Sequence, residues 1–128
     1  MKTLGIDYGE KRIGLAISDE SRTFARELGI LSPKEFWARI NAIIAENQIT
    51  QIVLGWPLNM AGAETKKTEE VANFKSEVAK KTGLPVAVSD ERLSSVMAQK
   101  LPGGNKNIDS LAAQILLQNY LDKNKLSR

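Results

Sequence analysis

Four acidic residues stand where carboxylates can do chemistry. Asp7 ends a short segment of alternating apolar residues, and Asp90 and Glu91 end another. Asp109 comes at the start of an apolar helical pattern. In open α/β sheets, ligands bind beyond the carboxyl ends of the strands, where the first three of these acids fall. Carboxylates gathered without cations raise one another's pKa values, so such a cluster indicates a bound divalent cation.

The composition narrows the chemistry further. The 128 residues contain no histidine and no cysteine, which excludes a Ser-His-Asp triad, a cysteine nucleophile, a disulfide and a zinc site of nitrogen and sulfur ligands. Mg²⁺ prefers oxygen ligands and keeps several of its waters. Two such ions about 4 Å apart can activate a water molecule and stabilise the leaving oxygen in phosphodiester hydrolysis. Metal-dependent hydrolysis is therefore chemistry that this composition permits.

Each acid also has an ordinary structural explanation. Asp109 could stabilise free amides at the start of a helix. Asp90 and Glu91 could be plain strand-end residues, with Arg92 paired to one of them. Asp7 is harder to explain in this way, because it interrupts an otherwise buried strand on the face with the smallest side chains. From spacing alone, both interpretations stay open.

The first acid depends on an N-terminal hairpin. Residues 3–18 read as two strands joined by a turn over residues 9–12. In the first strand Leu4 and Ile6 alternate with Gly5 and Asp7, so Asp7 lies on a face of small side chains. A third strand is expected over residues 23–31.

The rest of the chain predicts alternating helices and strands. In order, we expect a helix from Pro33 to near Asn47, a strand over Gln51–Trp56, a helix over Thr65–Lys81, a strand over Val86–Glu91, a short helix over Leu93–Leu101, and a last helix with Ile108, Leu111, Ala112, Ile115 and Leu116 on its apolar face, followed by a polar tail from Asp122. Ala112 and Ala113 would let this last helix lie close to the small face of the hairpin. These elements predict a single α/β domain over residues 1–128, with a mixed sheet and helices on both faces.

The charge distribution permits an anionic partner. Lys and Arg total 18 against 15 for Asp and Glu, a net charge of +3. Lys11 and Arg12 follow Asp7 in the turn, where they could hold phosphates, and Arg92 adjoins the acidic pair. Asn59, in the loop after the strand over Gln51–Trp56, is a further candidate contact. Solvated charge, or a local turn for Asn59, is the ordinary alternative.

Two more lysines begin a predicted helix. Lys66 and Lys67 are poorly placed for the dipole of that helix, which favours a role facing a ligand.

No apolar run is long enough to cross a bilayer and no signal peptide is evident, so we expect a cytoplasmic protein with no membrane partner.

Five segments carry a resemblance to a known family. They are residues 6–9 (IDYG), 11–16 (KRIGLA), 55–62 (GWPLNMAG), 90–95 (DERLSS) and 108–113 (IDSLAA). In this order and at this spacing they are similar to the motifs of the YqgF family. Its members are ribonuclease-H-like proteins, described as Holliday junction resolvases and as nucleases that mature precursor 16S ribosomal RNA.

The resemblance implies a ribonuclease-H-like fold with a five-stranded mixed sheet and a metal-dependent endonuclease. It carries metal-ligand roles onto Asp7, the Asp90–Glu91 pair and Asp109, with Mg²⁺ or Mn²⁺ as the ions, two of them. Within the pair we expect Glu91 to be the ligand, with Asp90 in reserve, because alternation places Glu91 on the face of Ala87 and Ser89. The implied substrate is precursor 16S rRNA, alone or in ribosomal precursor particles, with branched DNA as the alternative.

Three other function classes compete with this interpretation. An actin-like ATP-binding fold needs a duplicated domain, which this length opposes. A receiver domain needs a phosphoacceptor aspartate after a central strand, where this chain has Gly55-Trp56-Pro57. A non-catalytic RNA-binding module stays open, as does the choice between monomer and homodimer. A dimer would favour a junction resolvase, because symmetric cleavage of a four-way junction needs two active sites.

Overall fold

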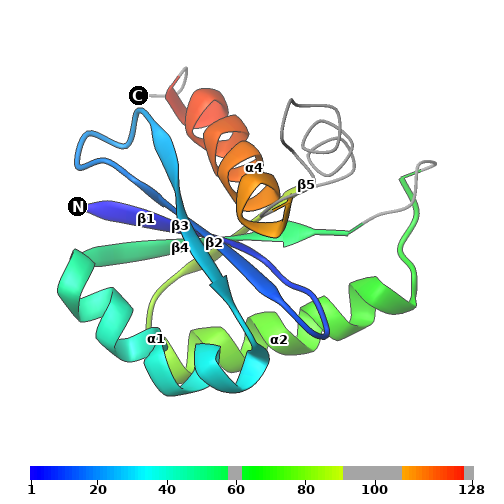
Figure 1. The fold of residues 1–128 in the computed structure, drawn as a ribbon. Coiled ribbons are helices and arrows are strands. Elements are labelled where there is room, and N and C mark those ends of the chain that lie inside the picture. Colours follow the sequence, from blue (N-terminus) through cyan, green and yellow to red (C-terminus); the bar gives the residue numbers. More distant parts are fainter. Residues whose placement is uncertain (58–61, 91–107, 126–128) are drawn as a thin grey trace.

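The computed structural model describes residues 1–57, 62–90 and 108–125 and builds them around one five-stranded sheet (Figure 1). The strands are β1 (Lys2–Asp7), β2 (Ile13–Ser18), β3 (Ala25–Leu31), β4 (Ile49–Trp56) and β5 (Val86–Asp90), and the helices are α1 (Pro33–Asn47), α2 (Lys66–Thr82) and α4 (Ile108–Lys125). Their order across the sheet is β3-β2-β1-β4-β5. β2 runs antiparallel to β1 and β3, whereas β1, β4 and β5 are parallel. The predicted mixed sheet is confirmed, and it differs from the doubly wound fold of a receiver domain.

Local capping explains where the first two helices begin and end. Ser32 Oγ accepts a hydrogen bond from the Glu35 amide (3.2 Å) and Glu35 Oε1 accepts one from the Ser32 amide (3.1 Å), a capping box. α2 begins after Thr65 and ends at Gly83, whose φ of 70° is the left-handed conformation that glycine adopts easily. Both helices lie within one residue of their predicted bounds.

Two strands differ from their expected bounds. β3 begins at Ala25 rather than Thr23, because Asp19 Oδ1 accepts hydrogen bonds from the amides of Thr23 (2.8 Å) and Phe24 (3.2 Å) and holds them in a turn. β4 begins earlier than expected, at Ile49, whose side chain is buried in the core.

Bulky side chains fill the space between the sheet and the α1–α2 layer, which lies below the sheet in Figure 1. The buried members of this core are Leu4, Ile6, Ile13, Leu15, Ile17, Phe36, Ile40, Ile43, Ile49, Ile52, Leu54, Val71, Phe74 and Val78. The alternation predicted for the hairpin is therefore correct, since every second residue of β1 and β2 enters this core. The intervening residues face the opposite layer, which α4 forms.

Helix α4 lies against β1 at a residue without a side chain. A Cβ added at Gly5 would lie 2.8 Å from the Leu117 Cβ and 3.3 Å from the Ala113 carbonyl oxygen. Ala16 of β2 and Ala113 are both fully buried in the same cluster. The expected close approach of the last helix to the small face of the hairpin is confirmed.

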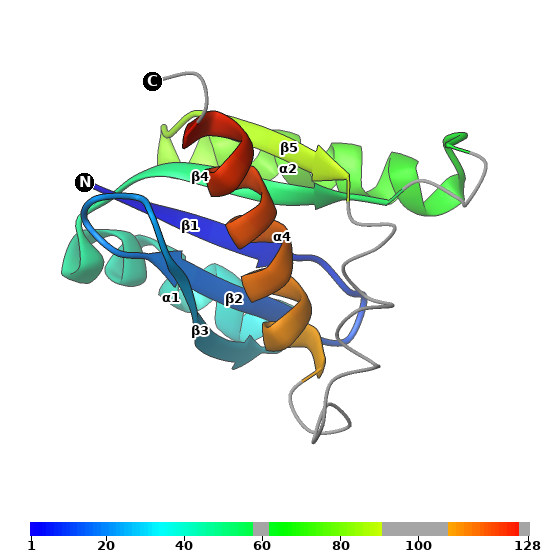
Figure 2. The same cartoon turned by 90° about the horizontal axis from the view of Figure 1, so that it is seen from above.

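A polar seam along α4 fixes its rotation against the edge strand β3. Gln118 accepts a hydrogen bond from the Ala25 amide (2.8 Å) and donates one to the Thr23 carbonyl (2.9 Å). Gln114, one turn earlier, donates to the Ala25 carbonyl (3.1 Å). Figure 2 shows the helix crossing the sheet, with its first turn (orange) over the β3 side.

Two expectations about this helix were wrong. Leu111 and Ile115, predicted for the apolar face, are only half-buried, whereas Leu117 and Leu121 are buried in the core. Because Gln114 and Gln118 must face β3 to form the seam, the helix is rotated so that Leu117 faces the core. The helix also continues through the expected polar tail to Lys125. No helix in the described ranges is both long and apolar enough to span a membrane.

We predict that Gly5→Ala lowers the free energy of unfolding by about 1–3 kcal/mol, because the added methyl group forces α4 away from β1. Urea unfolding measures this value. Without the close contact, a Gly→Ala change raises stability by about 0.4–1 kcal/mol through the unfolded chain. A more stable Gly5→Ala variant would therefore contradict the packing described above.

Candidate functional site

The carboxyl ends of three parallel strands meet at one edge of the sheet. Asp7 is the last residue of β1 and Asp90 is the last residue of β5. Ile6 pairs with Leu54 of β4, and Trp56 of β4 pairs with Asp90. The ends of β1 and β5 therefore share this edge, with β4 between them.

Small residues surround Asp7 on the face that α4 covers. Gly14 of β2 is paired directly with Asp7. On the other side, the β1–β4 register brings Gly55 next to it, and Gly55 is paired with Ser89 of β5. Asp7 is half-buried, and the residues beside it on the two adjoining strands are glycines, which carry no side chain. The lack of strand side chains at these two positions is compatible with a hydrated cation at Asp7.

The first turn of α4 brings Asp109 to the same face of the sheet. Asp109 follows Ile108, the first residue of the helix. The next residue, Ser110, is buried and its hydroxyl donates to Glu27 Oε1 of β3 at 3.3 Å. This contact continues the polar seam by one turn, so the seam also fixes the turn that carries Asp109.

The two faces of β5 bear on the choice within the acidic pair. Val86 packs against the α1–α2 core, whereas Ala87 packs against the cluster under α4. The face on which we place Glu91 is therefore the face of Asp7 and α4. Glu91 lies outside the described residues, so its preference over Asp90 stays a prediction.

The predicted metal ligands are all carboxylates, which suit a divalent cation. Among the side chains that the structure describes, no three acids gather into a metal cluster. Of the predicted ligands, only the side chain of Asp7 belongs to that set. The backbone places Asp7 and Asp90 at the same edge of the sheet and Asp109 in the first turn of α4, on the face that α4 covers. Every candidate ligand offers oxygen, as Mg²⁺ and Mn²⁺ prefer.

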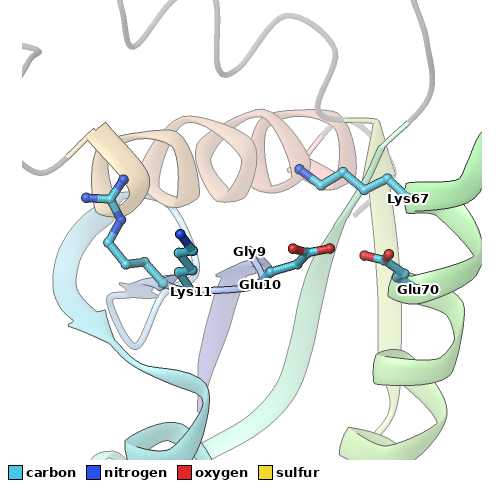
Figure 3. Close-up of a pocket in the computed structure, with 6 residues that line it drawn as sticks. Gly9, Glu10, Lys11, Lys67 and Glu70 are labelled. Carbon is cyan, nitrogen blue, oxygen red and sulfur yellow. The ribbon is translucent and has the colours of Figure 1, made fainter.

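The β1–β2 turn forms one wall of a cleft beside this edge. A Cβ at Gly9 would lie 2.5 Å from the Arg12 carbonyl oxygen, so the turn requires glycine. The cleft has a volume of about 420 Å³, and its lining residues are Gly9, Glu10, Lys11, Arg12, Lys67 and Glu70. Figure 3 shows Lys67 reaching toward the turn from α2. Lys11 and Arg12 are exposed there, as their predicted role requires; Asn59 and Arg92 lie outside the described residues.

Sequence reasoning missed the acidic part of this cleft. Glu10 and Glu70 come together because the β1–β2 turn packs against α2, a contact that the sequence does not reveal. Tyr8 and Phe74 make this contact, with ring centroids 4.4 Å apart. Burial, followed by the charges of Glu70, Glu10 and Glu77, raises the pKa of the Tyr8 hydroxyl. Tyr8 therefore stays protonated at neutral pH and is unsuited to act as a base.

Solved structures share this fold. Thermus thermophilus RuvC in complex with a Holliday junction substrate aligns over 99% of this chain and 97% of that chain, with a TM-score of 0.61 and 16% identity. The fowlpox virus resolvase, solved with Holliday junction DNA, aligns over 96% and 98%, with a TM-score of 0.55 and 16% identity. This likeness shows that the fold is ribonuclease-H-like, as the resemblance implied.

Sequence comparison covers nearly the whole chain. A relative from Dictyoglomus thermophilum named "Putative pre-16S rRNA nuclease" is 36% identical and covers 98% of this chain and 99% of its own length. A relative of the same name from Carboxydothermus hydrogenoformans is 39% identical, with 95% and 96% covered. The family model described as "RuvX: Holliday junction resolvase" matches residues 1–123. With its fold, its motifs and these relatives in agreement, the chain belongs to the RuvX family.

Proposed function

We propose that this chain is a divalent-metal-dependent endonuclease of the cytoplasm that cleaves precursor 16S rRNA during 5′-end maturation. The observation that carries the proposal is the half-buried Asp7 between glycines of the two adjoining strands, on the face where α4 supplies Asp109. The relatives' shared name favours this RNA as the substrate.

Three carboxylates of this chain would hold the ions. Asp7, Glu91 and Asp109 are the ligands we propose, with Asp90 in reserve. When bound, two Mg²⁺ or Mn²⁺ ions supply an activated water and stabilisation of the leaving oxygen. The strand β1 and the seam of α4 hold two of these residues on separate rigid elements, which limits the reorganisation that catalysis would otherwise need.

The chain's cations would position the substrate. Lys11 and Arg12 follow Asp7 by four and five residues in a turn that Gly9 keeps tight. We propose that they bind phosphates flanking the scissile bond, with Asn59 and Arg92 as further contacts. Only two tryptophans, two tyrosines and three phenylalanines occur in the chain, so recognition should rely on backbone and shape more than on base stacking.

A four-way DNA junction is the second candidate substrate. The description of the family as Holliday junction resolvases favours it. Both substrates offer phosphodiesters, and the metal chemistry proposed here does not by itself require a 2′-hydroxyl. The two candidates are therefore separated by comparison of substrates and not by active-site substitutions.

We predict that wild-type protein with Mn²⁺ cleaves precursor 16S rRNA faster than a synthetic four-way DNA junction. Asp7→Asn should lower the cleavage rate by at least about 100-fold, since even second-shell partners of a metal site cost 10- to 100-fold. Gel-based rates on both substrates in parallel measure these effects, and thermal unfolding shows that the variant is folded. RNA binding that Asp7→Asn leaves unchanged, without cleavage by either protein, would instead identify a non-catalytic RNA-binding module.

A second prediction concerns the acidic pair. Glu91→Gln should lose metal-dependent cleavage, while Asp90→Asn keeps most of it, because the face of Ala87 lies under α4 and the face of Val86 does not. Cleavage rates over a range of Mn²⁺ concentrations test this. If Asp90→Asn loses activity and Glu91→Gln retains it, the assignment by strand alternation is wrong.

A further inference from the structure

The cleft beside the β1–β2 turn carries charge on two facing walls. Lys11 and Arg12 come from the turn, whereas Lys67 comes from the first turn of α2. The carboxylates of Glu10 and Glu70 line the same space. In Figure 3 the ammonium group of Lys67 reaches from α2 toward the turn. Cations on both walls are suited to an anionic chain that passes between them.

The two lysines of the cleft are available to such a ligand. Within the described residues, neither Lys11 nor Lys67 forms an ion pair with a carboxylate. Lys67 and Glu70 are three residues apart on α2, a spacing that permits a pair, but the exposed Lys67 side chain extends toward the turn instead. A lysine at this end of the helix also opposes the helix dipole, so its position does not serve the helix.

A buried threonine fixes the α2 wall relative to Asp7. The hydroxyl of Thr68 donates to the Pro57 carbonyl (2.6 Å) and accepts from the Thr65 amide (2.9 Å), and Thr68 is only 1% exposed. Pro57 directly follows β4, which ends at the same edge of the sheet as β1. Lys67 is therefore attached to a turn that is anchored at the edge where Asp7 lies.

The acidic residues of the cleft would repel an anion from their own part of it. The charges of Glu70 and Glu10 act on Tyr8, which packs between the β1–β2 turn and α2. A phosphate should accordingly bind at the ammonium groups of the lysines and away from these carboxylates. Removal of the Glu70 charge should then strengthen binding of nucleic acid, the opposite of removing Lys67.

We infer that this cleft is a phosphate subsite for a nucleic-acid strand, with Lys67 as its cation on the α2 wall. The inference rests on the proposed function, because it takes the phosphodiester at Asp7 as the neighbour of the phosphate in the cleft. The strand would leave Asp7 between the β1–β2 turn and α2. Lys67 is a binding residue in this assignment and makes no contact with the reacting atoms.

The test measures the affinity of a short fluorescent single-stranded RNA at several KCl concentrations, with EDTA present so that no cleavage occurs. Lys67→Gln should weaken binding about fivefold at 0.1 M salt and lower the slope of log K against log salt by about 0.7, the value for one phosphate contact on a single strand. Glu70→Gln should tighten binding.

Lys66→Gln is the matched control. Lys66 has the same unfavourable place at the helix start and is exposed, but it does not line the cleft, so we assign the ligand-facing role to Lys67 alone. The slope for Lys66→Gln should stay close to that of wild type. An unchanged slope for Lys67→Gln, or equal losses for both lysine variants, would overturn the subsite. Cleavage by wild type with Mn²⁺ is measured in parallel. If wild type cleaves RNA and Lys67→Gln binds RNA as wild type does, only the subsite is contradicted. If Lys67→Gln alone weakens RNA binding and wild type does not cleave, only the nuclease activity is contradicted.

Discussion

The contact between α4 and β1 at Gly5 is the constraint on which the site depends. With 2.8 Å between a hypothetical Cβ at Gly5 and the Leu117 Cβ, the helix lies as close to the sheet as backbone packing permits. The same helix carries Asp109 in its first turn, while the same strand ends with Asp7 two residues after Gly5. The distance between these two acids therefore follows from the depth and rotation at which α4 packs.

The sheet sets the second part of the geometry. Because β1, β4 and β5 are parallel, their last residues meet at one edge, and α4 covers only one face of that edge. Glycines beside Asp7 on both neighbouring strands keep this face open. The cations of the cleft lie on different elements, the β1–β2 turn and α2, so the proposed binding surface and the proposed metal ligands come from separate parts of the chain.

Much of this arrangement can be read from alternation and spacing. The hairpin of β1 and β2, the small face that carries Asp7, and the close approach of Ala113 all follow from short-range patterns that the structure confirms. The rotation of α4 does not, because it depends on hydrogen bonds between Gln114, Gln118 and a strand about ninety residues earlier in the chain. The place of β4 between β1 and β5, and the charge of Glu10 and Glu70 in the cleft, are likewise consequences of tertiary packing that local patterns do not contain.

The central claim is that the first turn of α4 supplies a metal ligand beside Asp7, and not merely a residue that stabilises the start of a helix. Mn²⁺ binding to Asp109→Ser, measured by calorimetry together with the free energy of unfolding, tests this most directly, since serine can stabilise free helix amides but offers no carboxylate. The account predicts that Asp109→Ser keeps its stability and loses Mn²⁺ affinity as Asp7→Asn does, by at least about tenfold. Wild-type Mn²⁺ affinity in Asp109→Ser would contradict it.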